Sequence, residues 1–256
     1  MNQIRTYLTG AAATFSLALS LAFAPAAEAW GWGTSVTGSG TAKTETRPVS
    51  GFTGIGLSLP AKVTLIQGDK ESVTIEGDDN VVPLIESVVE RGSLKLRFTE
   101  KNINLKTKTV LRITVYAKTI ESLSVAGSGD IVADQLKSPT LKTSIAGSGD
   151  VAIKNLSADT VKVSISGSGD FAAGGKVDAI EANVAGSGNI KASRLESKTV
   201  KISIAGSGDA TVWAKEGLQV SVAGSGDVKY YGDPEIKKSV LGSGSMKRLG
   251  ATPDNK

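Results

Sequence analysis

The fold is decided by one stretch of sequence, residues 141–154, which reads LKTSIAGSGDVAIK. Apolar and polar residues alternate before the central Gly-Ser-Gly, and they alternate again after the aspartate that follows it. Alternation with a period of two is typical of a β-strand that buries one face. The stretch therefore predicts two short strands joined by a glycine corner.

The same unit recurs along the second half of the chain. Gly-Ser-Gly lies at residues 127–129, 147–149, 167–169, 186–188, 206–208, 224–226 and 242–244, so successive triplets are 18 to 20 residues apart. A unit of this length is too short for a propeller blade and lacks the period of helical repeats. Repeated strand–corner–strand units of this kind favour a solenoid, in which each unit stacks on its neighbours.

Alignment on the triplet tests whether the units can stack. The residue two positions before the triplet is β-branched in every unit: Val125, Ile145, Ile165, Val184, Ile204, Val222 and Val240. The residue one position earlier is always Ser or Asn: Ser124, Ser144, Ser164, Asn183, Ser203, Ser221 and Ser239. The units thus keep one face inward, which predicts an all-β, single-stranded parallel β-helix with coils of about 20 residues rising about 4.8 Å each. The usual crossover preference makes it right-handed.

The glycines of the triplets are predicted to form the corners, where a positive φ or close approach between coils excludes a side chain. These structural glycines are Gly127, Gly129, Gly147, Gly149, Gly167, Gly169, Gly186, Gly188, Gly206, Gly208, Gly224 and Gly226. The last unit differs, because Ser245 replaces the aspartate while Lys238 and Arg248 enter columns that are apolar or small elsewhere. A polar final coil would protect the open end of the stack.

The beginning of the chain has the pattern of a signal peptide. Arg5 precedes an apolar stretch over residues 8–24, and Ala27-Glu-Ala29 fits the small-residue cleavage rule. We expect residues 1–29 to be removed, which leaves an exported chain without a membrane span. An uncleaved anchor is the alternative, but the apolar stretch is short for one.

The mature chain divides into four predicted parts. Residues 30–46 are interpreted as a flexible lead-in, and residues 47–119 as irregular first coils of the solenoid, with a short helix possible over Val81–Glu90. Residues 120–250 are the regular coils, and residues 251–256 are a frayed tail. The whole solenoid is thus expected over residues 47–250.

The composition excludes several kinds of chemistry. The 256 residues include no Cys and no His, which rules out disulfides, Cys/His zinc sites and His-based nucleophile systems. The formal charge of +4 is mild and scattered, which gives no support for nucleic-acid binding. We expect no cofactor.

Several motifs together resemble one bacterial family. These are Phe52-Thr-Gly-Ile55, Gln67-Gly-Asp69, Glu76-Gly-Asp-Asp-Asn80 and the repeated Gly-Ser-Gly-Asp. Over residues 46–248 the chain resembles the family called "putative auto-transporter adhesin, head GIN domain". The resemblance implies a right-handed β-helix in an exported protein and brings no catalytic residues. An autotransporter would also need a C-terminal β-barrel, whereas this sequence ends at its last coil, so we do not expect self-secretion.

The aspartates that follow the triplets form a second column: Asp130, Asp150, Asp170, Asn189, Asp209 and Asp227. One interpretation is a calcium ladder, since Gly-x-Gly-x-Asp occurs in calcium-binding nonapeptide rolls. We favour a structural role, in which each side chain accepts hydrogen bonds from its own Gly-Ser-Gly backbone. Asn189 suits that role and would weaken a metal ladder, so we predict no metal site.

Trp213 and Tyr231 are the best candidate binding residues. Each lies four residues after its aspartate position, on adjacent coils, and alternation places both rings outward. Neighbouring exposed rings can stack on a sugar or a protein partner. Their alternative role is to cover a loop or the last coil. The outward serines, flanked by Lys142, Lys162, Lys201 and Lys237, could form an interaction stripe or an ice-binding face, but we favour a solvated surface.

These features predict an exported, non-catalytic β-helix that acts as an adhesin or cell-envelope binding module. Its partner would be a protein or glycan surface, in the periplasm or at the cell surface, and the sequence leaves the oligomeric state open. The first alternative is a calcium-stabilised glycan-binding module. The second is a carbohydrate-active enzyme, which the short, uniform loops disfavour because such enzymes line a cleft with long loops.

Overall fold

The computed structural model describes residues 34–100 and 102–253. The chain divides into two compact units, residues 1–32 and 33–256, and all described residues belong to the second. The predicted signal peptide, its cleavage site and the start of the lead-in therefore lie outside the described residues.

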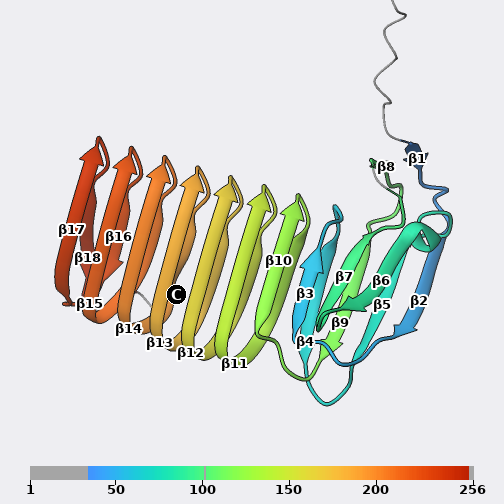
Figure 1. Cartoon of the computed structure of the whole chain (residues 1–256), viewed down its shortest axis with the longest axis horizontal. Helices are drawn as coiled ribbons and strands as arrows, with labels where there is room; N and C mark the ends of the chain where they lie inside the picture. The colour runs from blue at the N-terminus through green and yellow to red at the C-terminus, as the bar shows by residue number, and fades with distance from the viewer. Residues whose placement is uncertain (1–33, 101, 254–256) are drawn as a thin grey trace, which may run out of the picture. The chain divides into compact units, whose positions relative to one another are not determined.

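The regular half is a parallel β-helix of about 20-residue coils, which confirms the predicted fold class. Its strands are β10 (Ser122–Gly127), β11 (Asp130–Gly147), β12 (Val151–Gly167), β13 (Phe171–Gly186), β14 (Ile190–Gly206), β15 (Ala210–Gly224), β16 (Val228–Tyr231), β17 (Glu235–Gly242) and β18 (Met246–Gly250). Each coil pairs in parallel with the next, and the long strands lie side by side (Figure 1). The register is the one that the triplets predict, since Ile145 pairs with Ile165 and Gly147 with Gly167.

The predicted inward column forms the core of the stack. Val125, Ile145, Ile165, Val184, Ile204 and Val222 are each at most 2% exposed. Full burial of such a side chain stabilises the fold by about 1.5–3 kcal/mol relative to leaving it in water. The serine column is on the outer surface, as alternation requires. Each coil therefore adds one layer of branched apolar side chains to a continuous interior.

The Gly-Ser-Gly corner is built from backbone contacts between coils. The N–H groups of Ser168 and Gly169 both donate to the carbonyl oxygen of Gly147 in the previous coil, at 2.8 and 3.1 Å. Gly167 has a φ of +128°, which side chains rarely allow. A Cβ on Gly169 would overlap the carbonyl oxygen of Gly149. Both glycines of the triplet are thus required, the first by conformation and the second by space.

The first half of the chain has shorter strands: β1 (Ser35–Thr37), β2 (Ala42–Pro48), β3 (Gly54–Leu57), β4 (Lys62–Gln67), β5 (Ser72–Asp78), β6 (Ile85–Glu90), β7 (Ser93–Phe98), β8 (Asn104–Lys106) and β9 (Arg112–Ala117). Four of them form two coils. β3 and β4 stack in parallel on β10 and β11 on one side and on β7 and β9 on the other. The order of coils therefore differs from chain order, and the blue β3 lies between the green β10 and β7 in Figure 1.

The prediction that residues 47–119 form solenoid coils is wrong for part of that segment, because several of its strands pair antiparallel. β2 pairs with β5, β5 with β9, and β6 with β7, all antiparallel. The suggested helix over residues 81–90 is also wrong, because only one 3-10 turn, η1 (Val82–Leu84), precedes β6. Val88 and Val89 are β-branched, and pairing with β7 satisfies the backbone of this segment.

The lead-in is not flexible over residues 35–46, which corrects the prediction for that part. β1 pairs with β8, β2 pairs with β5, and the fully buried Asp78 ties the segment down. Its carboxylate accepts backbone N–H bonds from Gly40 at 2.8 Å, Lys108 at 3.0 Å and Thr109 at 3.2 Å. Burial raises the pKa of Asp78, but these N–H groups outweigh it and the net pKa is lowered.

The last coil, β17 and β18, forms the open end of the stack. Lys238 is exposed in what is elsewhere a core column, and Arg248 Nε donates to the carbonyl oxygen of Gly232 at 2.8 Å. Ile236, which pairs with the buried Leu218, is 40% exposed because it lies in the last coil, and Leu241 is 72% exposed because it stands in an outward-facing column. Residues 251–253 form no strand, and residues 254–256 lie outside the described residues.

Candidate functional site

The aspartate column forms a ladder of hydrogen bonds between coils. Each side chain accepts the backbone N–H of the equivalent residue in the next coil. The N–H to Oδ1 distances are 3.1 Å from Asp150 to Asp130, 2.8 Å from Asp170 to Asp150, 3.0 Å from Asn189 to Asp170, 3.0 Å from Asp209 to Asn189, 2.8 Å from Asp227 to Asp209 and 2.9 Å from Ser245 to Asp227. The ladder therefore continues the coil-to-coil pairing past the corner.

The predicted structural role of the column needs one correction. The donors belong to the following coil and not to each aspartate's own Gly-Ser-Gly, because the parallel stack brings the next N–H directly over the carboxylate. Asn189 takes part in the ladder like the aspartates. In the described part of the chain, no group of three or more His, Cys, Asp or Glu side chains is arranged to hold a metal ion.

Trp213 and Tyr231 lie directly beside each other, paired in register across β15 and β16. Both side chains are half-buried, whereas Tyr230, the residue before Tyr231, is 8% exposed and belongs to the core. Trp213 and Tyr231 are therefore partly exposed, four residues after the aspartate ladder in their coils.

Neighbouring coils hold the backbone of both aromatic residues. Ser197, which is completely buried, donates its hydroxyl to the carbonyl oxygen of Trp213 at 2.6 Å. The pairing of β14 with β15 is irregular between Ala192 and Glu196, so extra residues of β14 bulge out beside Trp213. On the other side, Tyr231 pairs with Gly250, and a Cβ on that glycine would lie 3.8 Å from the Tyr231 ring.

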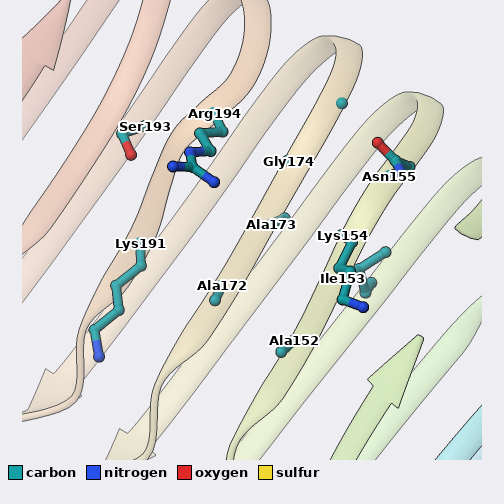
Figure 2. A pocket seen from close by; sticks show the side chains of 11 residues that line it. Ala152, Ile153, Lys154, Asn155, Ala172, Ala173, Gly174, Lys191, Ser193 and Arg194 are labelled. Carbon is teal, nitrogen blue, oxygen red and sulfur yellow. The ribbon is translucent and has the colours of Figure 1, made fainter. Parts of the chain in front are cut away.

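A trough of about 510 Å³ opens over β12, β13 and β14, on the side of the coils that carries Trp213 and Tyr231. Figure 2 shows Ala172, Ala173 and Gly174 on the middle strand, between Lys154 and Asn155 on one side and Lys191 and Arg194 on the other. The complete lining is Ala152, Ile153, Lys154, Asn155, Ala172, Ala173, Gly174, Gly175, Lys191, Ser193 and Arg194, which we call the trough.

The trough exists because β13 has a tighter corner than its neighbours. Its coil is one residue shorter than the coils on either side, and pairing slips next to it, between Ile153 and Leu156 and between Ala172 and Gly174. Gly175 has a φ of +113°, and a Cβ there would overlap the carbonyl oxygen of Leu156. A strand with only Ala and Gly at the corner leaves a depression between the longer side chains of β12 and β14.

The cations of the trough have carboxylate neighbours outside it. Lys154 Nζ lies 2.6 Å from Asp134 Oδ1, and Lys191 Nζ lies 2.6 Å from Asp170 Oδ2. Burial raises the pKa of Asp170, but hydrogen bonds from Lys191 and Asn189 lower it by more than burial raises it. The net pKa of Asp170 is therefore below its usual value. The hydrogen bond to Asp170 raises the pKa of Lys191. Lys191 therefore stays charged at neutral pH.

The serine face is separate from the trough and the rings. Its lysines Lys162 and Lys201 lie 3.5 and 3.6 Å from Glu181 on the coil between them. A groove of about 600 Å³ runs beside them, lined by residues from Thr160 to Lys237. Its charges alternate in sign along the stack, so it presents no single preferred charge to a partner.

Sequence reasoning found the aromatic pair but missed the trough. The signal was present in the spacing of 19 residues between the triplets at 167 and 186, and in the run Ala172-Ala-Gly-Gly175. Only the register shows that this short coil lies between lysine- and arginine-bearing neighbours, because a one-residue deletion shifts every later position of the coil.

Solved structures of similar proteins include several from Bacteroides and Parabacteroides species. A structure titled putative adhesin from Bacteroides fragilis has a TM-score of 0.78 and 29% identity, covering 84% of this chain and 100% of its own. A structure titled putative lipid binding protein from Parabacteroides distasonis has a TM-score of 0.72 and 28% identity, with the same coverage. A putative adhesin from Parabacteroides merdae, at 20% identity and a TM-score of 0.64 over 84% of this chain and 99% of its own, shares the fold.

The remaining comparisons concern curated proteins, membrane spans and the family. No curated protein matches this chain. Within the described residues, no helix combines the length and apolar character that crossing a membrane requires. Residues 51–234 match the family described as "Putative auto-transporter adhesin, head GIN domain", as the motifs predicted. The chain belongs to this family.

Proposed function

We propose that the chain is an exported, non-catalytic binding module of the adhesin type, which attaches to a glycan through the side of its solenoid. The observation that carries the proposal is the in-register pair Trp213 and Tyr231, half-buried on adjacent coils. Two aromatic side chains at paired positions of adjacent coils offer flat apolar area with little entropy to lose, which suits stacking on sugar rings.

The surrounding coils support a binding role. Trp213 and Tyr231 are held by strands that pair on both sides, so the rings are presented on a rigid scaffold. Adhesin-like family membership supports attachment to a surface. The N-terminal signal pattern supports export, with the periplasm and the cell surface as the two compartments in which such attachment takes place.

The chemistry of the side chains supports a non-catalytic role. The sequence has no His or Cys to act as general base or nucleophile near neutral pH. The carboxylates whose pKa values are lowered, such as Asp78, Asp170 and Asp227, accept hydrogen bonds from backbone N–H groups of neighbouring segments. They are engaged in holding the fold together.

A glycan array with matched variants tests the proposal. We expect the parent protein to bind a subset of glycans, and Trp213→Ala and Tyr231→Ala each to weaken that binding at least tenfold. Tyr116→Ala is the control, because Tyr116 is a half-buried ring on β9, away from the pair. Equal binding by parent and both variants would remove the aromatic site, and turnover of any polysaccharide would overturn the non-catalytic assignment.

A further inference from the structure

We propose that the trough and the two rings form one continuous track for a carboxylated polysaccharide, a chain that contains uronic acids. This inference rests on the proposed function and names the class of glycan. The track crosses β12, β13, β14, β15 and β16. At about 4.8 Å per coil its four steps span about 19 Å along the stack.

The register shows that the trough leads directly to the rings. Ala152, Ala172, Lys191 and Thr211 pair in series across β12 to β15. Trp213 lies two residues after Thr211 on the same strand, and Tyr231 pairs with Trp213 on the next coil. A ligand lying along the stack would therefore pass from the trough onto the rings without turning.

The charges in the trough select an anionic ligand. Lys154, Lys191 and Arg194 contribute three cations, and none of the described residues that line the trough is acidic. The partners of the two lysines, Asp134 and Asp170, lie outside the lining, and the lysine side chains are 77% and 61% exposed. Both partners of the Lys154–Asp134 pair are exposed, and exposed ion pairs stabilise a protein by only about 0–1 kcal/mol, so a ligand carboxylate can compete for Lys154.

The floor of the trough fits the rest of a sugar acid. Ala152 and Ala172 supply apolar area for the C–H face of a sugar ring, while Asn155 and Ser193 supply hydrogen-bonding groups at the edge. This combination of apolar floor, polar rim and cations matches a pyranose ring that carries hydroxyl groups and one carboxylate.

An acidic peptide fits this surface less well. Extended peptides bind most readily by adding a strand to a free sheet edge. The strands β12 to β15 each pair with a neighbour on both sides, so this part of the surface has no edge to offer. A peptide would be held by its side chains alone.

Calorimetry on the mature chain with three probes tests the inference. The probes are polygalacturonate, its methyl ester, which keeps the sugar and removes the charge, and polyglutamate, which keeps the charge and removes the sugar. We expect polygalacturonate to bind at least tenfold more tightly than the other two, and more weakly as salt is added. Failure of polygalacturonate to bind, or equal binding of polyglutamate, would overturn the inference.

Two variants locate the site on the trough. Lys154→Gln combined with Arg194→Gln removes two cations, and Ala172→Leu fills the floor without changing charge. Each is expected to weaken polygalacturonate binding about tenfold. Lys142→Gln combined with Lys201→Gln removes two cations from the serine face and is expected to leave binding unchanged. Thermal melting shows whether each variant has folded. If the variant with Lys154→Gln and Arg194→Gln does not fold, Ala172→Leu, at a surface position, still tests the trough.

The results separate this inference from the proposed function. If the trough variants bind polygalacturonate as the parent does, the inference fails. If that happens while Trp213→Ala and Tyr231→Ala still lose array binding, the proposed function stands without it. If the aromatic variants bind every glycan like the parent, the proposed function fails, and the continuous track fails with it.

Discussion

Replacement of Asp150 is the sharpest perturbation of the aspartate ladder. Asp150 Oδ1 accepts the backbone N–H of Asp170 at 2.8 Å, and its own N–H donates to Asp130. Asp150→Ala removes the first bond and keeps the second, since the second uses the backbone of residue 150. Asp150→Asn keeps both, because Asn189 already accepts the N–H of Asp209 at 3.0 Å in the same column.

The expected magnitude follows from the kind of bond and its exposure. A hydrogen bond to a charged group contributes about 1.5–3 kcal/mol, and water can reach the freed N–H at this exposed corner, so we expect Asp150→Ala to cost about 1–1.5 kcal/mol. For a chain of this size that loss lowers the Tm by about 2–6 °C. Asp150→Asn should shift the Tm by less than about 1 °C.

Thermal melting and amide hydrogen exchange together measure the effect. The melting curves give the loss of stability, and exchange at the Asp170 amide reports the bond itself, which should be protected in the parent and in Asp150→Asn but not in Asp150→Ala. An Asp150→Ala variant with unchanged Tm and an equally protected Asp170 amide would refute the ladder as a stabilising feature.

Three further predictions concern the corner, acid and calcium. Gly169→Ala should destabilise the chain by at least about 1–3 kcal/mol, since its Cβ would overlap a backbone carbonyl of the previous coil, whereas Gly68→Ala, whose Cβ meets nothing within 4 Å, should be neutral in the same urea titration. The pKa values of Asp78, Asp170 and Asp227 are depressed in the folded chain, so their stabilising effect is present above about pH 4 and lost as the pH falls below it. A Tm that stays constant between pH 4 and pH 2 would contradict that sign. Millimolar Ca²⁺ should leave the Tm unchanged, because the ladder carboxylates already accept N–H bonds, and a rise in Tm would favour the calcium alternative.

The repeated half of the fold could be predicted because each of its coils has the same pattern of buried residues and glycine corners. Every coil buries the same column and turns at the same glycines, so the pairing of Ile145 with Ile165 follows from alignment alone. The adjacency of Trp213 and Tyr231 follows in the same way, and alternation predicts that both rings point outward, although the structure leaves both residues half-buried.

The first half could not be predicted because its contacts are not repeated. Nothing in the local pattern of β3 indicates that it stacks between β7 and β10, since that arrangement depends on contacts across about 40 to 70 residues of chain. Asp78 shows the same limit. It belongs to the motif Glu76-Gly-Asp-Asp-Asn80, but its role in holding the backbone N–H groups of Gly40 and Lys108 depends on distant segments that meet only in the folded chain.

Hydroxyl-radical footprinting, with the strongest-binding glycan from the array, tests the central claim most directly, since it reports the exposure of individual aromatic side chains. The account predicts that the glycan lowers oxidation of Trp213 and Tyr231 and leaves that of Tyr116 on β9 unchanged. Protection of Tyr116 alone, or unchanged oxidation of Trp213 and Tyr231 at saturating glycan, would contradict a binding surface on this side of the solenoid.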